Sequence, residues 1–157
     1  MRFTLLKDLT QDRVMRPTLT GLLLFSILYL LSDLFVKQAT FGLLPQKVLS
    51  TLYGNEEAFI DPISEASFLE FWHTEIFFIM MLLFTLSTIC IRLCNASRFS
   101  LFMVNAILIS ALVTLSVLPF AYYFSQDLIY LYCVGSILWH IMAFFVAIFS
   151  LKRLYFA

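Results

Sequence analysis

The stretch LEFWHTEIFFIMMLLFTLSTICI, Leu69 to Ile91, is an apolar run whose ionisable residues lie only near its beginning. A helix of about 20 residues crosses the roughly 30 Å of hydrocarbon in a bilayer, so this stretch is long enough to span a membrane. Three more stretches are as apolar and as long, at residues 17–36, 99–124 and 128–151. The sequence therefore predicts four membrane-spanning segments.

The composition agrees with a membrane protein. Hydrophobic residues make up 62% of the chain and charged residues 13%, which is more apolar side chain than a soluble chain of 157 residues could bury. Gly and Pro are few and strict alternation is absent, which favours helices over a β-barrel. We predict an all-α membrane protein: an antiparallel four-helix transmembrane bundle that forms a single domain over residues 1–157.

Charge predicts the orientation and excludes one class of partner. The net charge is zero without a basic run, so we expect no nucleic-acid partner. The N-terminal MRFTLLKDLTQDRVM is too charged, and too far from the apolar run, for a cleavable signal, so the first span should remain as an anchor. Positive residues concentrate on the cytoplasmic side, which predicts a bacterial inner-membrane protein with both termini inside. Eight of the ten basic residues share one side: Arg2, Lys7, Arg13, Arg16, Arg92, Arg98, Lys152 and Arg153.

The outer loop, residues 38–66, is the longest connection and carries an amphipathic pattern. In PQKVLSTLYGN, Pro45 suits the first turn of a helix and Gly54 suits its end. Between them, Val48, Leu49 and Leu52 fall on one helical face. We expect a short, structured helix here, lying on the headgroups or on the mouth of the bundle.

Ionisable residues gather where the second span begins. Ser67 and Glu70 have the spacing of a capping box, in which the serine and the glutamate satisfy amides at a helix start. His73 falls on the same helical face as Glu70, whereas Glu75 lies on the opposite face. We therefore expect Glu75 to meet water and headgroups, and Glu70 with His73 to point into the bundle in an E-x-x-H arrangement.

Counting residues from the basic side places several polar groups at one depth. His73 is 19 residues from Arg92, and Cys133 is 19 residues from Lys152. With Asp33, Glu70 and Ser116 they form a predicted polar layer that could hold a metal ion or a polar ligand headgroup. The ligands of a metal ion would be Asp33, Glu70, His73 and Cys133. Asp33 also has Lys37 one turn later, so an ion pair at the rim explains it equally well.

His140 lies deep in the fourth span, 12 residues before Lys152. An ionisable group at this depth faces a partner or a cavity. One interpretation is a neutral histidine bonded to Ser136 or to a neighbouring helix. Another is axial ligation of a b-type haem, for which His73 and His140 would be the cofactor-binding pair, although they differ in depth by about 10 Å. Small and polar residues surround it in a stripe typical of packed membrane helices: Cys133, Ser136, His140, Ala143 and Ala147.

In the third span, Pro119 has no amide hydrogen to donate and should kink the helix. The carbonyl of Leu115, four residues earlier, is predicted to be left free.

The run FLEFWHTEIFFIMMLLFTLSTI, preceded by TLYGNEEAFIDP, resembles small four-span bacterial inner-membrane proteins of uncharacterised function. Their second helix opens with Leu-Glu-x-x-His-x-His-Leu-Phe. The likeness covers Thr51 to Leu83; His73 matches the first histidine, and Glu75 stands in place of the second. It implies the four-span fold rather than an activity.

Two functional classes follow. The first is an accessory or assembly subunit without catalytic activity of its own, packed against other membrane subunits and offering residues 38–66 to an extracytoplasmic protein. The second is a redox subunit that binds haem, a metal ion or quinol through His140 or through the layer of Asp33, Glu70, His73 and Cys133. A transporter is disfavoured, since four spans without a charged midplane would need to oligomerise to form a path.

Overall fold

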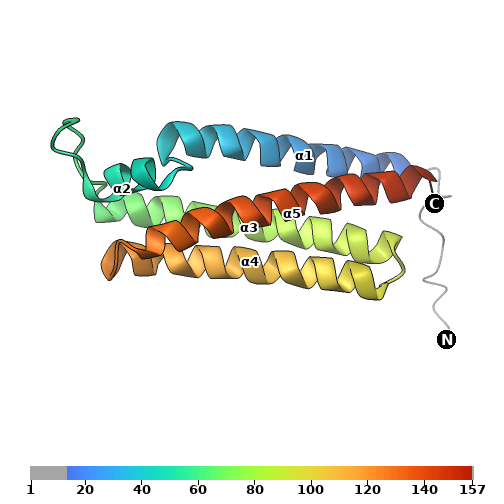
Figure 1. The fold of residues 1–157 in the computed structure, drawn as a ribbon. Helices are drawn as coiled ribbons and strands as arrows, with labels where there is room; N and C mark the ends of the chain where they lie inside the picture. The colour runs from blue at the N-terminus through green and yellow to red at the C-terminus, as the bar shows by residue number, and fades with distance from the viewer. Residues whose placement is uncertain (1–13, 157) are drawn as a thin grey trace.

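Four long helices lie side by side, with α1 and α4 running in one direction and α3 and α5 in the opposite one (Figure 1): α1 (Met15–Thr40), α3 (Glu65–Leu93), α4 (Arg98–Tyr123) and α5 (Leu128–Phe156). The computed structural model describes residues 14–156; Arg2, Lys7, Arg13 and all but the last two residues of the N-terminal segment MRFTLLKDLTQDRVM lie outside them. All four helices are long and apolar enough to cross a membrane. The predicted all-α, four-helix membrane architecture is confirmed.

The helices are longer than the predicted spans. They contain 26 to 29 residues, which at 1.5 Å per residue is about 39–44 Å against roughly 30 Å of hydrocarbon. Their ends therefore extend into the headgroup regions. We call the end that carries α2 (Pro45–Tyr53) and residues 124–127 the loop end, and the end that carries residues 94–97 the basic end.

The start of α3 differs from the prediction. The helix begins at Glu65, and the Ser64 hydroxyl accepts a hydrogen bond from the Ser67 amide at 3.2 Å. Ser64 has extended backbone and is the cap, so Ser67 already lies inside the helix. The prediction that Glu70 caps this helix is wrong, because the chain turns helical three residues earlier and Glu70 is exposed in the second turn.

Helix α5 packs against all four other helices. Its predicted stripe of small and polar residues, from Cys133 to Ala147, is buried along this packing face. Gly135 lies at a close approach to α4, where an added Cβ would stand 2.4 Å from the Thr114 hydroxyl oxygen. Small side chains at such contacts let helices come together in lipid, where hydrophobic burial supplies little driving force.

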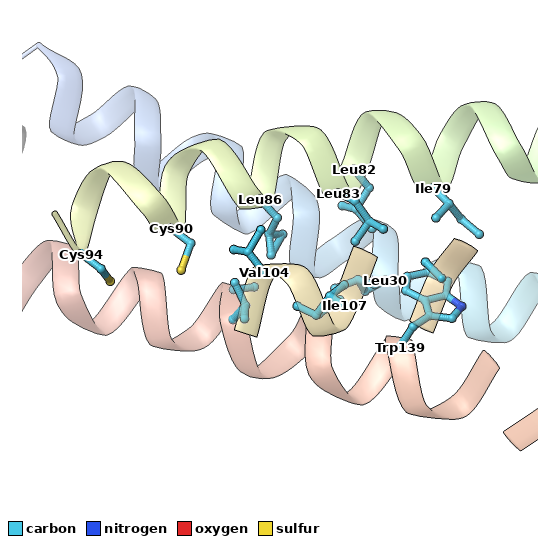
Figure 2. Packing of buried hydrophobic residues seen from close by; sticks show 14 residues of the cluster. Leu30, Ile79, Leu82, Leu83, Leu86, Cys90, Cys94, Val104, Ile107 and Trp139 are labelled. Carbon is cyan, nitrogen blue, oxygen red and sulfur yellow. The ribbon is translucent and has the colours of Figure 1, made fainter. Parts of the chain in front are cut away.

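The central core consists mainly of aliphatic side chains from the four long helices. Figure 2 shows Ile79, Leu83, Leu86 and Cys90 of α3 along the side of that helix that faces the bundle, with Trp139 of α5 near the loop-end side of the cluster. These buried α3 positions recur every three or four residues, the spacing of helices packed in a left-handed bundle.

At the loop end, the predicted helix is present as α2, with Pro45 in its first turn and Gly54 at its end with φ of 82°. It packs on the mouth of the bundle: Val48 and Leu52 are buried in a cluster with Phe68.

The Leu115 carbonyl, which Pro119 leaves without its helical donor, accepts a hydrogen bond from the Trp72 indole at 2.8 Å. This bond connects α3 to α4.

Candidate functional site

Four ionisable side chains meet inside the bundle. Asp33 and Lys37 come from α1, Glu75 from α3 and His140 from α5. The Lys37 ammonium lies 3.1 Å from an Asp33 carboxylate oxygen and 2.6 Å from a Glu75 carboxylate oxygen. The same Asp33 oxygen lies 2.7 Å from Nε2 of His140. We call these four residues the ion network; it joins three of the four long helices.

The ion network is buried at membrane depth. The exposed fractions of the side chains are 3% for Lys37, 8% for Asp33, 13% for Glu75 and 2% for His140. Counting 1.5 Å per residue from the midpoint of each helix puts His140 about 3 Å, Glu75 about 6 Å and Asp33 about 8 Å toward the loop end. These positions lie inside a hydrocarbon layer whose half-thickness is about 15 Å.

Hydrogen-bond chemistry determines how many protons the ion network holds. Nδ1 of His140 lies 2.7 Å from the Ser136 carbonyl oxygen, which can only accept, so Nδ1 carries a hydrogen. Between Nε2 and the Asp33 oxygen there must be one more hydrogen, because two bare acceptors would repel at 2.7 Å. Whichever atom carries it, the Asp33–His140 pair is formally neutral.

The remaining two charges cancel as well, since the Lys37 ammonium is paired with the Glu75 carboxylate. The Lys37 ammonium also lies 5.4 Å from the centre of the Trp139 ring, within range of a cation–π attraction. A group of zero net charge whose members pair with one another costs far less in hydrocarbon than an isolated ion. The ion network therefore satisfies itself without a ligand.

The sequence patterns around the ion network explain why these residues face inward. On α1, Lys37 continues a buried series spaced by three or four residues: Leu19, Leu23, Ser26 and Leu30. On α3, Glu75 continues the series of Phe68, Ile79, Leu82 and Leu86. The prediction that Glu75 meets water and headgroups is wrong; it shares the packing face. This spacing of about 3.5 residues is the signal that could have found Lys37 and Glu75.

His73 and Glu70 are both exposed, on the side of α3 away from Glu75. Cys133 is buried in the loop-end cluster with Ile129 and Tyr132. The structure thus brings Asp33 and His140 together, but not Asp33 with Glu70, His73 and Cys133. Within residues 14–156, no three His, Cys, Asp or Glu residues are placed to hold a metal ion.

His140 has the hydrogen-bonded arrangement that was one of its two interpretations: it contacts both Ser136 and a neighbouring helix. An axial haem ligand needs a free ring nitrogen, and both nitrogens of His140 are engaged. His73, the proposed second ligand, is exposed on another face. The residues present therefore do not fit a bis-histidine haem site.

A comparison with protein families matches residues 42–157 to Aq_1264_TM, described as a transmembrane helical domain. The matched region contains Glu75 and His140, while Asp33 and Lys37 precede it. Searches of curated proteins and of solved structures gave no match. Because the match spans well over half of the chain, this protein belongs to the Aq_1264_TM family of transmembrane helical domains.

Proposed function

We propose that this membrane protein is a non-catalytic accessory subunit whose loop end binds a protein partner outside the cytoplasm. The observation that carries the proposal is Phe59, an aromatic side chain that is 96% exposed at the tip of an ordered loop. In Figure 1 the segment after α2 reaches past the ends of the long helices. Exposed aromatic residues on ordered loops are typical anchors of protein interfaces.

The loop is held by its own hydrogen bonds. Asn55 and Ile60 form an antiparallel bridge, with amide-to-carbonyl distances of 2.8 and 3.0 Å. The Ala58 amide also donates to the Asn55 side-chain oxygen at 3.2 Å. Phe59 has φ of 53°, a left-handed conformation that costs about 1–3 kcal/mol for a residue other than glycine. The combination of a costly backbone conformation and an exposed apolar ring at one residue supports a binding role.

The loop is also attached firmly to the bundle through α2. The Ile63 amide donates to the Thr51 carbonyl at 3.0 Å, and the Thr51 hydroxyl donates to the Phe41 carbonyl at 3.1 Å. The Tyr53 hydroxyl donates to the Ala121 carbonyl near the end of α4. Partial burial, with a smaller contribution from Tyr122, raises the pKa of Tyr53 and keeps its hydroxyl a donor. A preorganised loop loses little entropy on binding.

Charge suggests the chemistry of the partner. Glu56, Glu57 and Asp61 lie beside Phe59 in the chain, and all three are exposed. A complementary surface has an apolar pocket for the ring and Lys or Arg at its rim. The same carboxylates repel anionic lipid headgroups, which favours a protein partner over the membrane surface.

The orientation is part of the proposal. The basic end carries Arg92, Arg98 and Lys152, which favours a cytoplasmic location, so the loop end faces outward. A membrane-impermeant thiol reagent should label Ser50→Cys from the outside of intact cells. A cysteine at Ala96, in the turn at the basic end, is the matched control and should react only after permeabilisation. The opposite labelling pattern would refute the orientation.

The partner is tested by a photo-crosslinking amino acid placed at Phe59 in cells. We expect one discrete adduct, which disappears when Glu56, Glu57 and Asp61 are changed to Lys. The same probe at Gln126, in the other connection at this end, is the control and should give no such adduct. Identical adducts at both positions, or no adduct at Phe59, would refute the proposed function.

The alternative function, a haem-, metal- or quinol-binding redox subunit, depends on His140 and on the layer of Asp33, Glu70, His73 and Cys133. This alternative has less support, because both ring nitrogens of His140 are hydrogen-bonded and the structure does not bring the residues of the layer together. An absorption spectrum and metal analysis of the purified protein distinguish the two. A Soret band that His140→Phe abolishes would favour the redox subunit.

A further inference from the structure

Asn105 is a polar residue on the outside of the bundle at membrane depth. It lies seven residues after Arg98 in α4, about 10 Å along the helix axis. Since α4 is about 39 Å long and the hydrocarbon about 30 Å thick, Asn105 lies within the hydrocarbon layer. Its side chain is exposed on the lipid-facing surface.

Asn105 differs from Ser32 and Thr88, two other polar residues on the outside of the helices. Ser32 and Thr88 are also exposed, but their hydroxyls donate to carbonyls one turn earlier in their own helices, at 2.9 and 2.8 Å. The Asn105 amide has two N–H donors and a carbonyl acceptor, and it makes no hydrogen bond with any residue between 14 and 156. In hydrocarbon no water replaces such a partner, so the amide favours association with another polar group.

We propose that α4 is a homodimer interface in which the Asn105 amides of two copies hydrogen-bond to each other across a two-fold axis. A second copy is the occupant favoured by geometry, because copies inserted with the same topology present Asn105 at the same depth. The chemistry also favours a second copy. A primary amide is both a donor and an acceptor, so it can pair with the identical amide of the other copy. A two-fold axis along the membrane normal brings the Asn105 surface of one copy against the same surface of the other.

The surface around Asn105 allows close approach. A groove of about 510 Å³ between α4 and α5 includes Asn105 and has small residues, Ala106, Ser110 and Gly135, in its lining. Ile109, which also lines the groove, and Leu112 of α4 are 62% and 66% exposed. This apolar ridge of one copy can pack beside the groove of the other, as small residues at membrane interfaces permit.

The association is measured with labelled full-length protein in liposomes over a range of protein-to-lipid ratios. We expect reversible dimers for the wild type and a roughly 3- to 30-fold weaker association for Asn105→Leu, the range that one interhelical hydrogen bond supports. Asn105→Gln, which keeps the amide, should retain part of the affinity. Ser32→Leu is the matched control: it removes an exposed polar group whose hydrogen bond is already satisfied, and it should leave association unchanged.

Disulfide crosslinking tests the same interface without removing Asn105. Ile109→Cys should form an oxidised dimer, whereas Phe25→Cys on α1 should not; the native cysteines are buried and remain in place. A wild type that stays monomeric at every ratio would overturn the proposal. So would an unchanged affinity for Asn105→Leu, or equal crosslinking at positions 25 and 109. None of these outcomes bears on Phe59, so the proposed function is tested independently.

Discussion

The two halves of the bundle are held together differently. Toward the basic end, the core consists of aliphatic and small side chains such as Leu86, Val104 and Ala147. Toward the loop end, α1, α3 and α5 are also joined by the ion network of Asp33, Lys37, Glu75 and His140. Aliphatic contacts tolerate sliding and rotation of a helix, because lipid tails and core side chains are equally apolar. Ion pairs do not tolerate such movements, since each charge needs its own partner.

Helix α1 depends on the ion network for its position. This helix contacts α5 and α3, and it contributes two of the four ionisable groups. A rotation or a one-turn shift of α1 would leave a carboxylate or an ammonium unpaired in hydrocarbon. We infer that the ion network fixes the register of α1, while the aliphatic half supplies packing.

Removing one charge of the Lys37–Glu75 ion pair should destabilise the protein most. Lys37→Met leaves Glu75 as an uncompensated buried carboxylate, so we expect a loss of about 3–5 kcal/mol in the free energy of unfolding. Unfolding in mixed detergent micelles, followed by circular dichroism, measures it. Lys152→Met, an exposed lysine at the basic end, is the control and should change stability by less than about 0.5 kcal/mol. Equal stabilities for the two variants would show that the ion network is dispensable.

Removing both members of an ion pair separates the effect of charge from the effect of packing. The double variant Lys37→Met with Glu75→Leu eliminates both charges and leaves the neutral Asp33–His140 pair intact. Replacing a buried ion pair with apolar residues is often close to neutral, so we expect it to recover about 2–3 kcal/mol relative to Lys37→Met alone. The same unfolding assay measures the recovery. A double variant as unstable as the single one would mean that packing by Lys37, rather than its charge, matters.

A third change disturbs packing instead of charge. Gly135→Ala places a Cβ 2.4 Å from the Thr114 hydroxyl oxygen, so we expect a loss of about 1–3 kcal/mol in unfolding free energy. Gly21→Ala is the matched control, because nothing lies within 4 Å of its Cβ, and it should stabilise α1 by up to about 1 kcal/mol. Adding Thr114→Ala to Gly135→Ala should restore part of the loss; no restoration would place the strain elsewhere.

The smallest effect concerns the attachment of α2. Tyr53→Phe removes the hydrogen bond to Ala121 and should lower the local stability of α2 by about 0.5–1.5 kcal/mol. Faster hydrogen exchange over residues 45–53 measures this loss. Because the pKa of Tyr53 is raised on folding, its contribution is present below about pH 10 and lost as the pH rises through the raised value. Melting temperatures of wild type and Tyr53→Phe should therefore converge at high pH; a constant difference would exclude the hydroxyl as the cause.

The helices and their ends could be predicted from the order of the residues. An apolar run such as Leu69 to Ile91 must be helical in a bilayer, because only a helix satisfies its backbone within one segment. Pro45 and Gly54 predicted the bounds of α2, and Pro119 predicted the free carbonyl of Leu115 that Trp72 binds. These features depend on local backbone chemistry, which the order of residues specifies directly.

The side of each helix that faces inward depends on how the helices pack and could not be predicted in the same way. On α3, the sequence correctly placed Glu70 and His73 opposite Glu75, but the inward face was assigned to the wrong pair. In a soluble helix the apolar face would mark the interior. In a membrane helix both faces are apolar, so the orientation is set by a partner distant in sequence, the Lys37 ammonium on α1, which pairs with Glu75 only once the helices have packed.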